Sequence, residues 1–131
     1  NLARCLERMM DHVNNVSMFL IGHEEHIPFL NLTPPIQQLP LWQESLKELM
    51  INIRTQDSYR IEAARHQLKT LQIELKAYET SIFDDEKKNQ QMASSLSISE
   101  SVRRLCAYSR DFGEILLNMK LASLMIEVRE N

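Results

Sequence analysis

All four prolines of the chain lie in one short stretch, and this constrains the fold more than any other feature of the sequence. They are Pro28, Pro34, Pro35 and Pro40, in a chain of 131 residues with only 2 glycines. Proline disrupts a helix interior, and a β-sandwich or barrel needs a turn, rich in glycine and proline, every ~8 to 12 residues. We therefore expect long helices on both sides of a proline-rich connector at residues 23–39.

The residues before the connector predict an amphipathic helix over residues 1–22 that ends at Gly22. Its apolar residues recur at spacings of three and four: Leu2, Leu6, Met9, Val13, Val16 and Leu20. On the opposite side of this helix lie Glu7, Asp11, Asn14 and Met18.

Residues 40–131 predict three more helices. The first starts at Pro40 with Trp42 docked near its start, and it ends near residues 55–57. The second is capped by Asp57 or Ser58 and runs to Phe83, and the polar residues 84–91 form either a loop or solvated helix. Ser97 or Ser99 caps the last helix. With no competing strand, the chain is expected to be all-α, a single domain (1–131) formed by an antiparallel four-helix bundle.

Composition excludes several classes of function. The 15 Lys and Arg against 18 Asp and Glu give a net charge of −3, which argues against direct binding of nucleic acid by this segment. No apolar run approaches the ~18 residues of a membrane span, and no targeting signal is visible, so membrane insertion is not expected. Cys5 and Cys106 lie far apart in no metal or redox spacing, and we expect free core thiols in a reducing compartment.

Motifs that would indicate catalysis are missing from the sequence. There is no glycine-rich phosphate loop, no C-x-x-C and no recognisable nucleophile and base set. His23 and His26 lie three apart at a helix end, which excludes an H-E-x-x-H metalloprotease helix, and the Glu-x-x-His pairs of a di-metal oxidase are missing. We therefore expect a protein that is not an enzyme.

Glu7 and Asp11 are spaced i, i+4 on the outward face of the first helix. Such a pair can bridge a hard or borderline cation, but two ligands alone do not hold a metal, so others would come from solvent, a neighbouring helix or a second chain. Two ordinary solvated acids are the alternative interpretation of the same spacing.

Residues 6–16, LERMMDHVNNV, resemble the signature helix of the PhoU family of phosphate-uptake regulators, which reads roughly I-E-R-I-x-D-H-A-x-N-I. The matching positions are Glu7, Arg8, Asp11, His12 and Asn15. That family is a duplication of a three-helix bundle, with the signature on the last helix of each half. Residues 102–115, VRRLCAYSRDFGEI, resemble the archaeal form of the second copy. The chain is thus similar to the last helix of one half followed by the complete second half, and we expect a longer parent protein.

The second copy departs from the family pattern. Arg103 and Ala107 stand where the first copy has Glu7 and Asp11, and Lys69 falls in a region where the family carries an acidic run. Asp111 and Glu114 are the remaining acids that could help to hold a cation there, although a solvated face is the simpler interpretation. The arginines at 103, 104 and 110 could meet phosphate or an acidic partner, but Glu100, Asp111 and Glu114 dilute them, which indicates a mixed surface.

The resemblance implies a cytoplasmic, non-enzymatic homodimer that regulates phosphate uptake and the phosphate response by contact with the phosphate transporter and the sensor kinase. It also implies a metal ion, Fe, Zn or Mn, at an outward acidic patch, for which Glu7, Asp11, Asp111 and Glu114 are the candidate ligands. The alternative is a structural or oligomerising helical module, without metal, of a larger regulator; an attached DNA-binding segment is a variant of this alternative.

Overall fold

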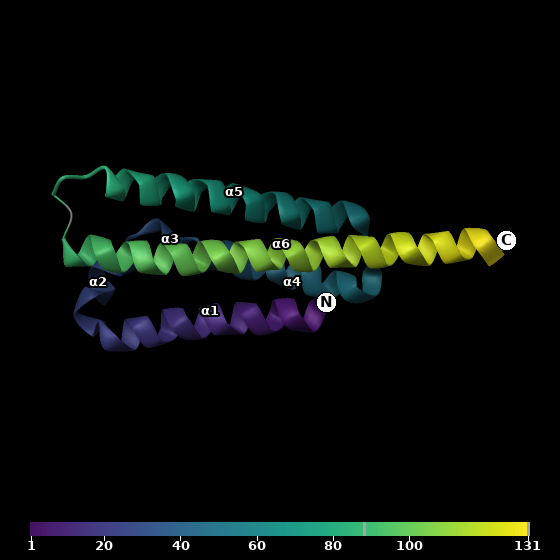
Figure 1. Ribbon diagram of the computed structural model, residues 1–131, viewed down its shortest axis with the longest axis horizontal. Coiled ribbons are helices and arrows are strands. Elements are labelled where there is room, and N and C mark those ends of the chain that lie inside the picture. Colours follow the sequence, from purple (N-terminus) through teal and green to yellow (C-terminus); the bar gives the residue numbers. More distant parts are fainter. Residues whose placement is uncertain (88, 131) are drawn as a thin grey trace.

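The computed structural model describes residues 1–87 and 89–130, and this part of the chain is helical with no strand. Four long helices are present: α1 (Leu2–Gly22), α4 (Leu39–Thr55), α5 (Ser58–Phe83) and α6 (Gln90–Glu130). Between α1 and α4 lie three short segments: η1 (Glu24–His26), α2 (Ile27–Leu30) and α3 (Pro34–Gln37) (Figure 1). The expected all-α bundle is confirmed.

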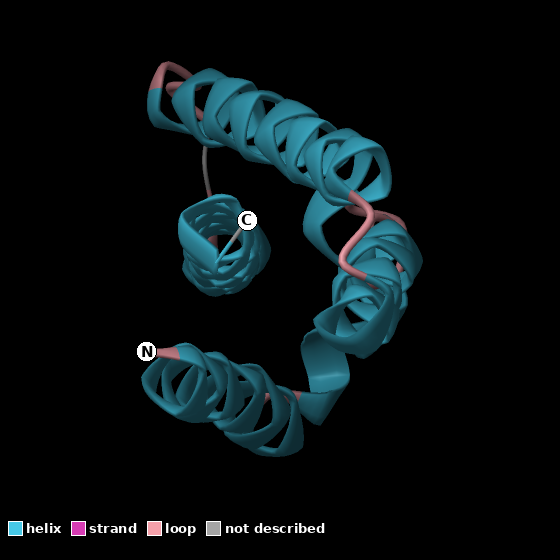
Figure 2. Cartoon of the chain, turned by 90° about the vertical axis from the view of Figure 1, so that its right-hand side faces the viewer, coloured by secondary structure: helices cyan, strands magenta, loops and turns pink. Residues whose placement is uncertain are grey.

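Consecutive long helices run antiparallel along one axis (Figure 1). In the view along that axis, α5, α4 and α1 form a curved layer, and α6 lies on its concave side (Figure 2). Helix α6 contacts α1, α4 and α5, whereas α1 contacts few residues outside α6 and η1. The apolar stripes of the other long helices therefore meet on α6.

The core lies along the contact between α6 and the curved layer. Its fully buried side chains include Leu49 of α4, Leu68 and Leu75 of α5, and Leu105 and Phe112 of α6. The expected docking of Trp42 is confirmed: its indole is buried and its Nε1 donates to Ser109 Oγ at 2.9 Å.

Gly113 permits close approach of the helices in this core. A Cβ atom at Gly113 would lie 2.8 Å from Cγ of Arg65 and 3.1 Å from Cδ2 of Leu49. Gly113 therefore serves close packing between helices and does not form a turn.

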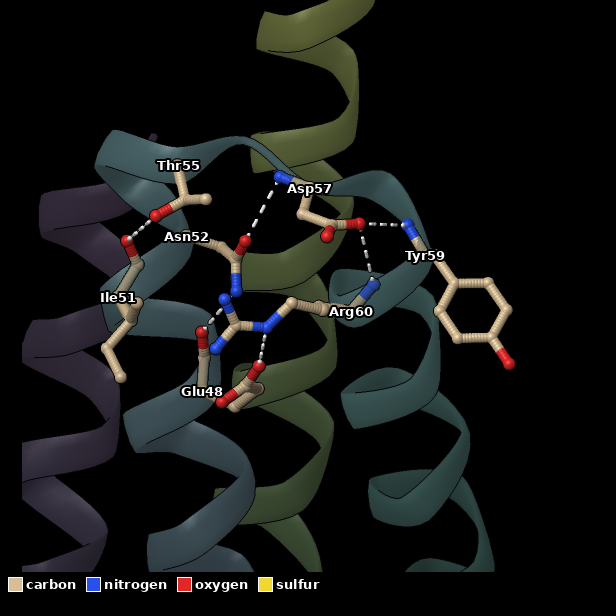
Figure 3. A network of polar contacts seen from close by, with 7 residues as sticks. All are labelled: Glu48, Ile51, Asn52, Thr55, Asp57, Tyr59 and Arg60. Atoms are coloured by element: carbon tan, nitrogen blue, oxygen red, sulfur yellow. Dashed lines mark hydrogen bonds and ion pairs between the residues drawn. The ribbon is translucent and has the colours of Figure 1, made fainter.

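The junction between α4 and α5 is fixed by side-chain caps (Figure 3). Gln56 adopts a left-handed conformation (φ 52°), and Asn52 Oδ1 accepts from the backbone N–H of Asp57 at 3.0 Å. Asp57 Oδ1 in turn accepts from the N–H groups of Tyr59 and Arg60 at 3.0 and 3.2 Å. Of the two expected caps, Asp57 is the one used. The ion pair between Glu48 and Arg60 ties the two helices together beside it.

The expected start of the last helix at Ser97 or Ser99 is wrong, because α6 begins at Gln90. Asn89 caps it: Asn89 Oδ1 accepts from the N–H of Met92 at 3.0 Å. Ser99 lies inside the helix, fully buried, and its Oγ donates to Glu79. Serines 94, 95 and 99 bond to side chains of the neighbouring helices and do not cap α6. Of the polar residues 84–91, 84–87 and 89 lie outside the helices, and Lys88 lies outside the described residues.

The connector folds as short helical segments and not as an extended loop. Prolines lie in the first turns of α2, α3 and α4, where the missing N–H costs no hydrogen bond. Pro40 takes the expected first-turn position. The connector also contributes to the core, since Leu30 and Pro35 are buried.

The C-terminal end of α6 extends past the other helices (Figure 1). Every residue from 121 to 130 is exposed. Within residues 1–87 and 89–130, no helix combines the length and the apolar character needed to cross a membrane.

Candidate functional site

All four predicted metal ligands lie on the outside of the bundle. Glu7 and Asp11 are exposed on α1, and Asp111 and Glu114 are exposed on α6. The expectation that both pairs face outward is confirmed. However, the described part of the chain holds no group of three or more His, Cys, Asp or Glu side chains arranged to hold a metal ion. One protomer thus supplies at most a pair of acids at each position, and metal binding stays a prediction.

The two segments that resemble the PhoU signature pack against each other along the α1–α6 seam. The His12 ring stacks on Tyr108 with ring centroids 5.6 Å apart, and the Arg8 guanidinium carbon lies 5.5 Å from the Tyr108 centroid. Deeper in the same seam, Ser109 Oγ lies 3.1 Å from Met9 Sδ. These contacts join residues about a hundred positions apart in the sequence, as the hydroxyl–sulfur contact between Met9 and Ser109 illustrates.

Burial and the Arg104 charge lower the pKa of His12, while Asp11 and Glu100 act in the opposite direction. Its Nδ1 is buried and has no hydrogen-bond partner among the described residues. A histidine of this kind is neutral at pH 7, and its free ring nitrogen is an unused polar atom at the seam.

His23 and His26 lie close together at the end of α1, with ring centroids 5.8 Å apart. His23 Nδ1 donates to the Phe19 carbonyl at 2.8 Å, and His26 Nδ1 lies 2.9 Å from Ser94 Oγ. The His23 contact therefore lies within the end of α1, and the His26 contact joins η1 to α6.

The two cysteines lie inside the fold as expected of free thiols. Cys106 is fully buried and burial raises its pKa to about 12, while Cys5 is half-buried, and both are free. Cys106 therefore offers no thiolate at neutral pH to a metal or an electrophile.

A buried carboxylate joins α5 to α6. Glu79, whose side chain is 6% exposed, accepts two hydrogen bonds from Arg103, from Nε to Oε2 at 2.9 Å and from Nη2 to Oε1 at 3.0 Å. Ser99 Oγ adds a third bond to Oε2 at 3.1 Å. The hydrogen bond with Glu79 raises the pKa of Arg103, against the opposing effect of burial. The guanidinium of Arg103 is therefore held in one orientation.

Arg103 lines a groove of about 610 Å³ between α5 and α6. Its lining has four basic side chains, two polar ones and an apolar floor, contributed by Lys69, Gln72, Ile73, Lys76, Ala77, Thr80, Arg103 and Arg110. Arg110 Nη1 donates to Gln72 Oε1 at 3.0 Å, and its buried Nε has no partner among the described residues. None of the described residues that line the groove is Asp or Glu.

The acids that dilute the arginines in the sequence lie outside the groove that Arg103 and Arg110 line. Glu100 pairs with Arg104 at 2.7 Å, and Asp111 and Glu114 do not line the groove. Lys69 and Lys76, which were not predicted to belong to this surface, lie on the same face of α5 and line the groove. The signal that would have found them is the spacing of seven shared by residues 69 and 76 and by residues 103 and 110.

Comparisons with protein-family models, with curated proteins and with solved structures found no match to this chain.

Proposed function

We propose that the chain is a non-enzymatic regulator of the PhoU type, which acts in the cytoplasm by contact with the phosphate transporter and the sensor kinase of the phosphate response. The observation that carries this proposal is the α1–α6 seam, in which the two signature-like segments pack on each other through His12, Tyr108 and Met9. A duplicated signature that meets itself in the fold is expected if the two segments are equivalent helices of a repeat.

The phosphate link is tested in the organism that encodes the chain. Deletion of the gene should change the rate of phosphate uptake under phosphate-replete growth, and the wild-type gene should restore it. An uptake rate that the deletion leaves unchanged would reject the phosphate role. Co-purification of transporter subunits with the tagged full-length protein would identify the contact directly.

The metal is part of the same proposal. Glu7 and Asp11 would hold Fe, Zn or Mn together with solvent or with ligands from a second chain. Elemental analysis of the purified protein should find near-stoichiometric metal that the Glu7→Ala, Asp11→Ala variant loses. The matched control, Asp84→Ala with Glu86→Ala, removes two exposed acids outside the signature and should retain the metal.

A second candidate function is an oligomerising module. It is favoured by the end of α6, where large apolar side chains are exposed without cover: Met119, Leu121, Leu124, Met125, Ile126 and Val128. Contiguous exposed apolar residues mark contact surfaces. If this end joins two copies, light scattering should give the mass of a dimer, and Leu121→Glu with Leu124→Glu should give a monomer. The same change at Met10 and Met18 of α1, which are also exposed, is the control.

A further inference from the structure

The groove between α5 and α6 carries a ladder of positive charge. Gln72 bonds Arg110 and Glu79 bonds Arg103, so these two contacts fix the level of each arginine along α5. Counted along α5, the cations then follow in the order Lys69, Arg110, Lys76, Arg103, at levels 69, 72, 76 and 79. With a rise of about 1.5 Å per residue, the ladder is about 15 Å long with steps of roughly 4.5 to 6 Å.

Most of this charge is not neutralised by ion pairs within the described part of the chain. Within the described residues, no ion pair involves Lys69, Lys76 or Arg110. Of the four cations that line the groove, Glu79 forms an ion pair with Arg103. The nearby acid Glu74 accepts a hydrogen bond from Gln38 of the connector at 2.8 Å, and it does not line the groove.

The floor between the cations is apolar. Ile73 is 60% exposed, and with Ala77 it lies among the residues that line the groove. A large exposed isoleucine flanked by rows of cations fits a ligand that has both apolar and acidic groups.

We propose that this groove binds an acidic amphipathic helix of a partner protein. The steps of three, four and three residues are those of a helix face, so carboxylates at i, i+3, i+7 and i+10 of a docked helix match the ladder step for step. Apolar side chains between those carboxylates pack on Ile73 and Ala77. The ladder is too long for one phosphate group, and the described lining has no aromatic platform for nucleic-acid bases.

This inference names the contact surface of the proposed function and rests on that function only in assuming that the chain acts by binding protein. The probe is a fluorescent synthetic helix with glutamates at i, i+3, i+7 and i+10 and with leucine and alanine between them. A peptide of the same composition in scrambled order is its control. Fluorescence anisotropy with the full chain measures both dissociation constants.

We expect the phased peptide to bind more tightly than the scrambled one. Lys69→Gln with Lys76→Gln should weaken the phased peptide about tenfold, because two exposed ion pairs are lost. Ile73→Ala should weaken it by a smaller factor. The matched control, Lys47→Gln with Lys87→Gln, removes the same charge from exposed positions outside the groove and should bind as the wild type.

Equal binding of the two peptides, or equal binding by the Lys69, Lys76 variant and its control, would overturn the proposal. So would stronger competition by tripolyphosphate than by unlabelled peptide, which would make the groove a site for a small oxyanion. The peptide assay and the uptake assay test different proposals. A change in phosphate uptake without peptide binding would reject only the proposed role of the groove. Peptide binding without a change in phosphate uptake would reject only the phosphate role.

Discussion

Two parts of α6 both carry large apolar side chains but have opposite surroundings. Residues 102–116 bury five large side chains against α1, α4 and α5: Val102, Leu105, Cys106, Phe112 and Leu116. Residues 119–128 carry six large apolar side chains, all of them between 44% and 76% exposed. Both parts are continuous helix, so the difference lies in what covers them.

The layer of α1, α4 and α5 covers residues 102–116 and leaves residues 121–130 exposed, so the extent of this layer determines which part of α6 belongs to the core. The cover ends near Lys120, whose Nζ donates to Ser58 Oγ at the start of α5 (3.1 Å). Beyond this contact the side chains of residues 121–130 are exposed in the described part of the chain, and the apolar ones among them are available for another molecule.

The largest expected effect comes from the same substitution made in the two parts of α6. Leu105 is 1% exposed, and Leu105→Ala should lower the free energy of unfolding by about 2–5 kcal/mol because it leaves a cavity. Leu121 is 58% exposed, and Leu121→Ala should change it by no more than about 0.5 kcal/mol. Urea denaturation of both variants measures the difference.

A large loss of unfolding free energy for Leu121→Ala would contradict the expectation that this side chain is exposed in the monomer. If that loss grew on concentrating the protein, the end of α6 would be covered by a second copy in solution.

The next effect separates a buried ion pair of α6 from an exposed one. Glu79→Ala removes the partner of Arg103 and Ser99 and should cost about 3 kcal/mol, because a partly buried guanidinium loses its counter-charge. Glu100→Ala breaks the Glu100–Arg104 pair, in which both side chains are about half exposed, and should cost less than about 1 kcal/mol. Thermal unfolding of the two variants under identical conditions compares them. Similar losses would mean that Arg103 finds water or another acceptor once Glu79 is gone.

Much of the fold could be predicted from the sequence because the apolar stripes are long and the helix breakers few. The ends of α1 at Gly22 and of α5 at Phe83 and the cap at Asp57 agree with the structure. The predicted start of α6 was wrong because a serine hydroxyl can either cap a helix or form a hydrogen bond across a helix interface. For Ser99, the position of Glu79 on α5 decides between the two roles.

The candidate groove depends on the register between two helices. The spacing of residues 103 and 110 is visible in the sequence, but the acids near them lead to the interpretation of a mixed surface. The pairing of Glu100 with Arg104 and the facing of Arg110 with Gln72 are tertiary contacts, and no periodicity within one helix predicts them.

The boundary between the two parts of α6 should respond to the cap of α5. Asp57→Ala removes the acceptor of two backbone N–H groups beside Ser58, and it should cost about 1 kcal/mol. Asp57→Asn keeps an oxygen in the same place and should lose only a fraction of that. Hydrogen exchange should show faster opening of the first turn of α5 and of the Lys120 region in the alanine variant. If the asparagine variant lost as much, the charge of Asp57 would matter more than its cap.

The smallest expected effect is a pH dependence at the α1–α6 seam. Burial lowers the folded-state pKa of His12 below the ordinary value of 6.5, so the unfolded chain binds a proton more readily than the folded one does. The contribution of His12 to stability is therefore complete above pH 6.5 and is lost as the pH falls from there through the lowered folded-state pKa. His12→Gln should flatten the fall in melting temperature between pH 7.5 and about pH 5.5, where most carboxylates are still ionised. The control is His66→Gln, at an exposed position of α5, which should leave the slope of melting temperature against pH unchanged. If His12→Gln also left this slope unchanged, the His12 ring would not be held against Tyr108 in solution.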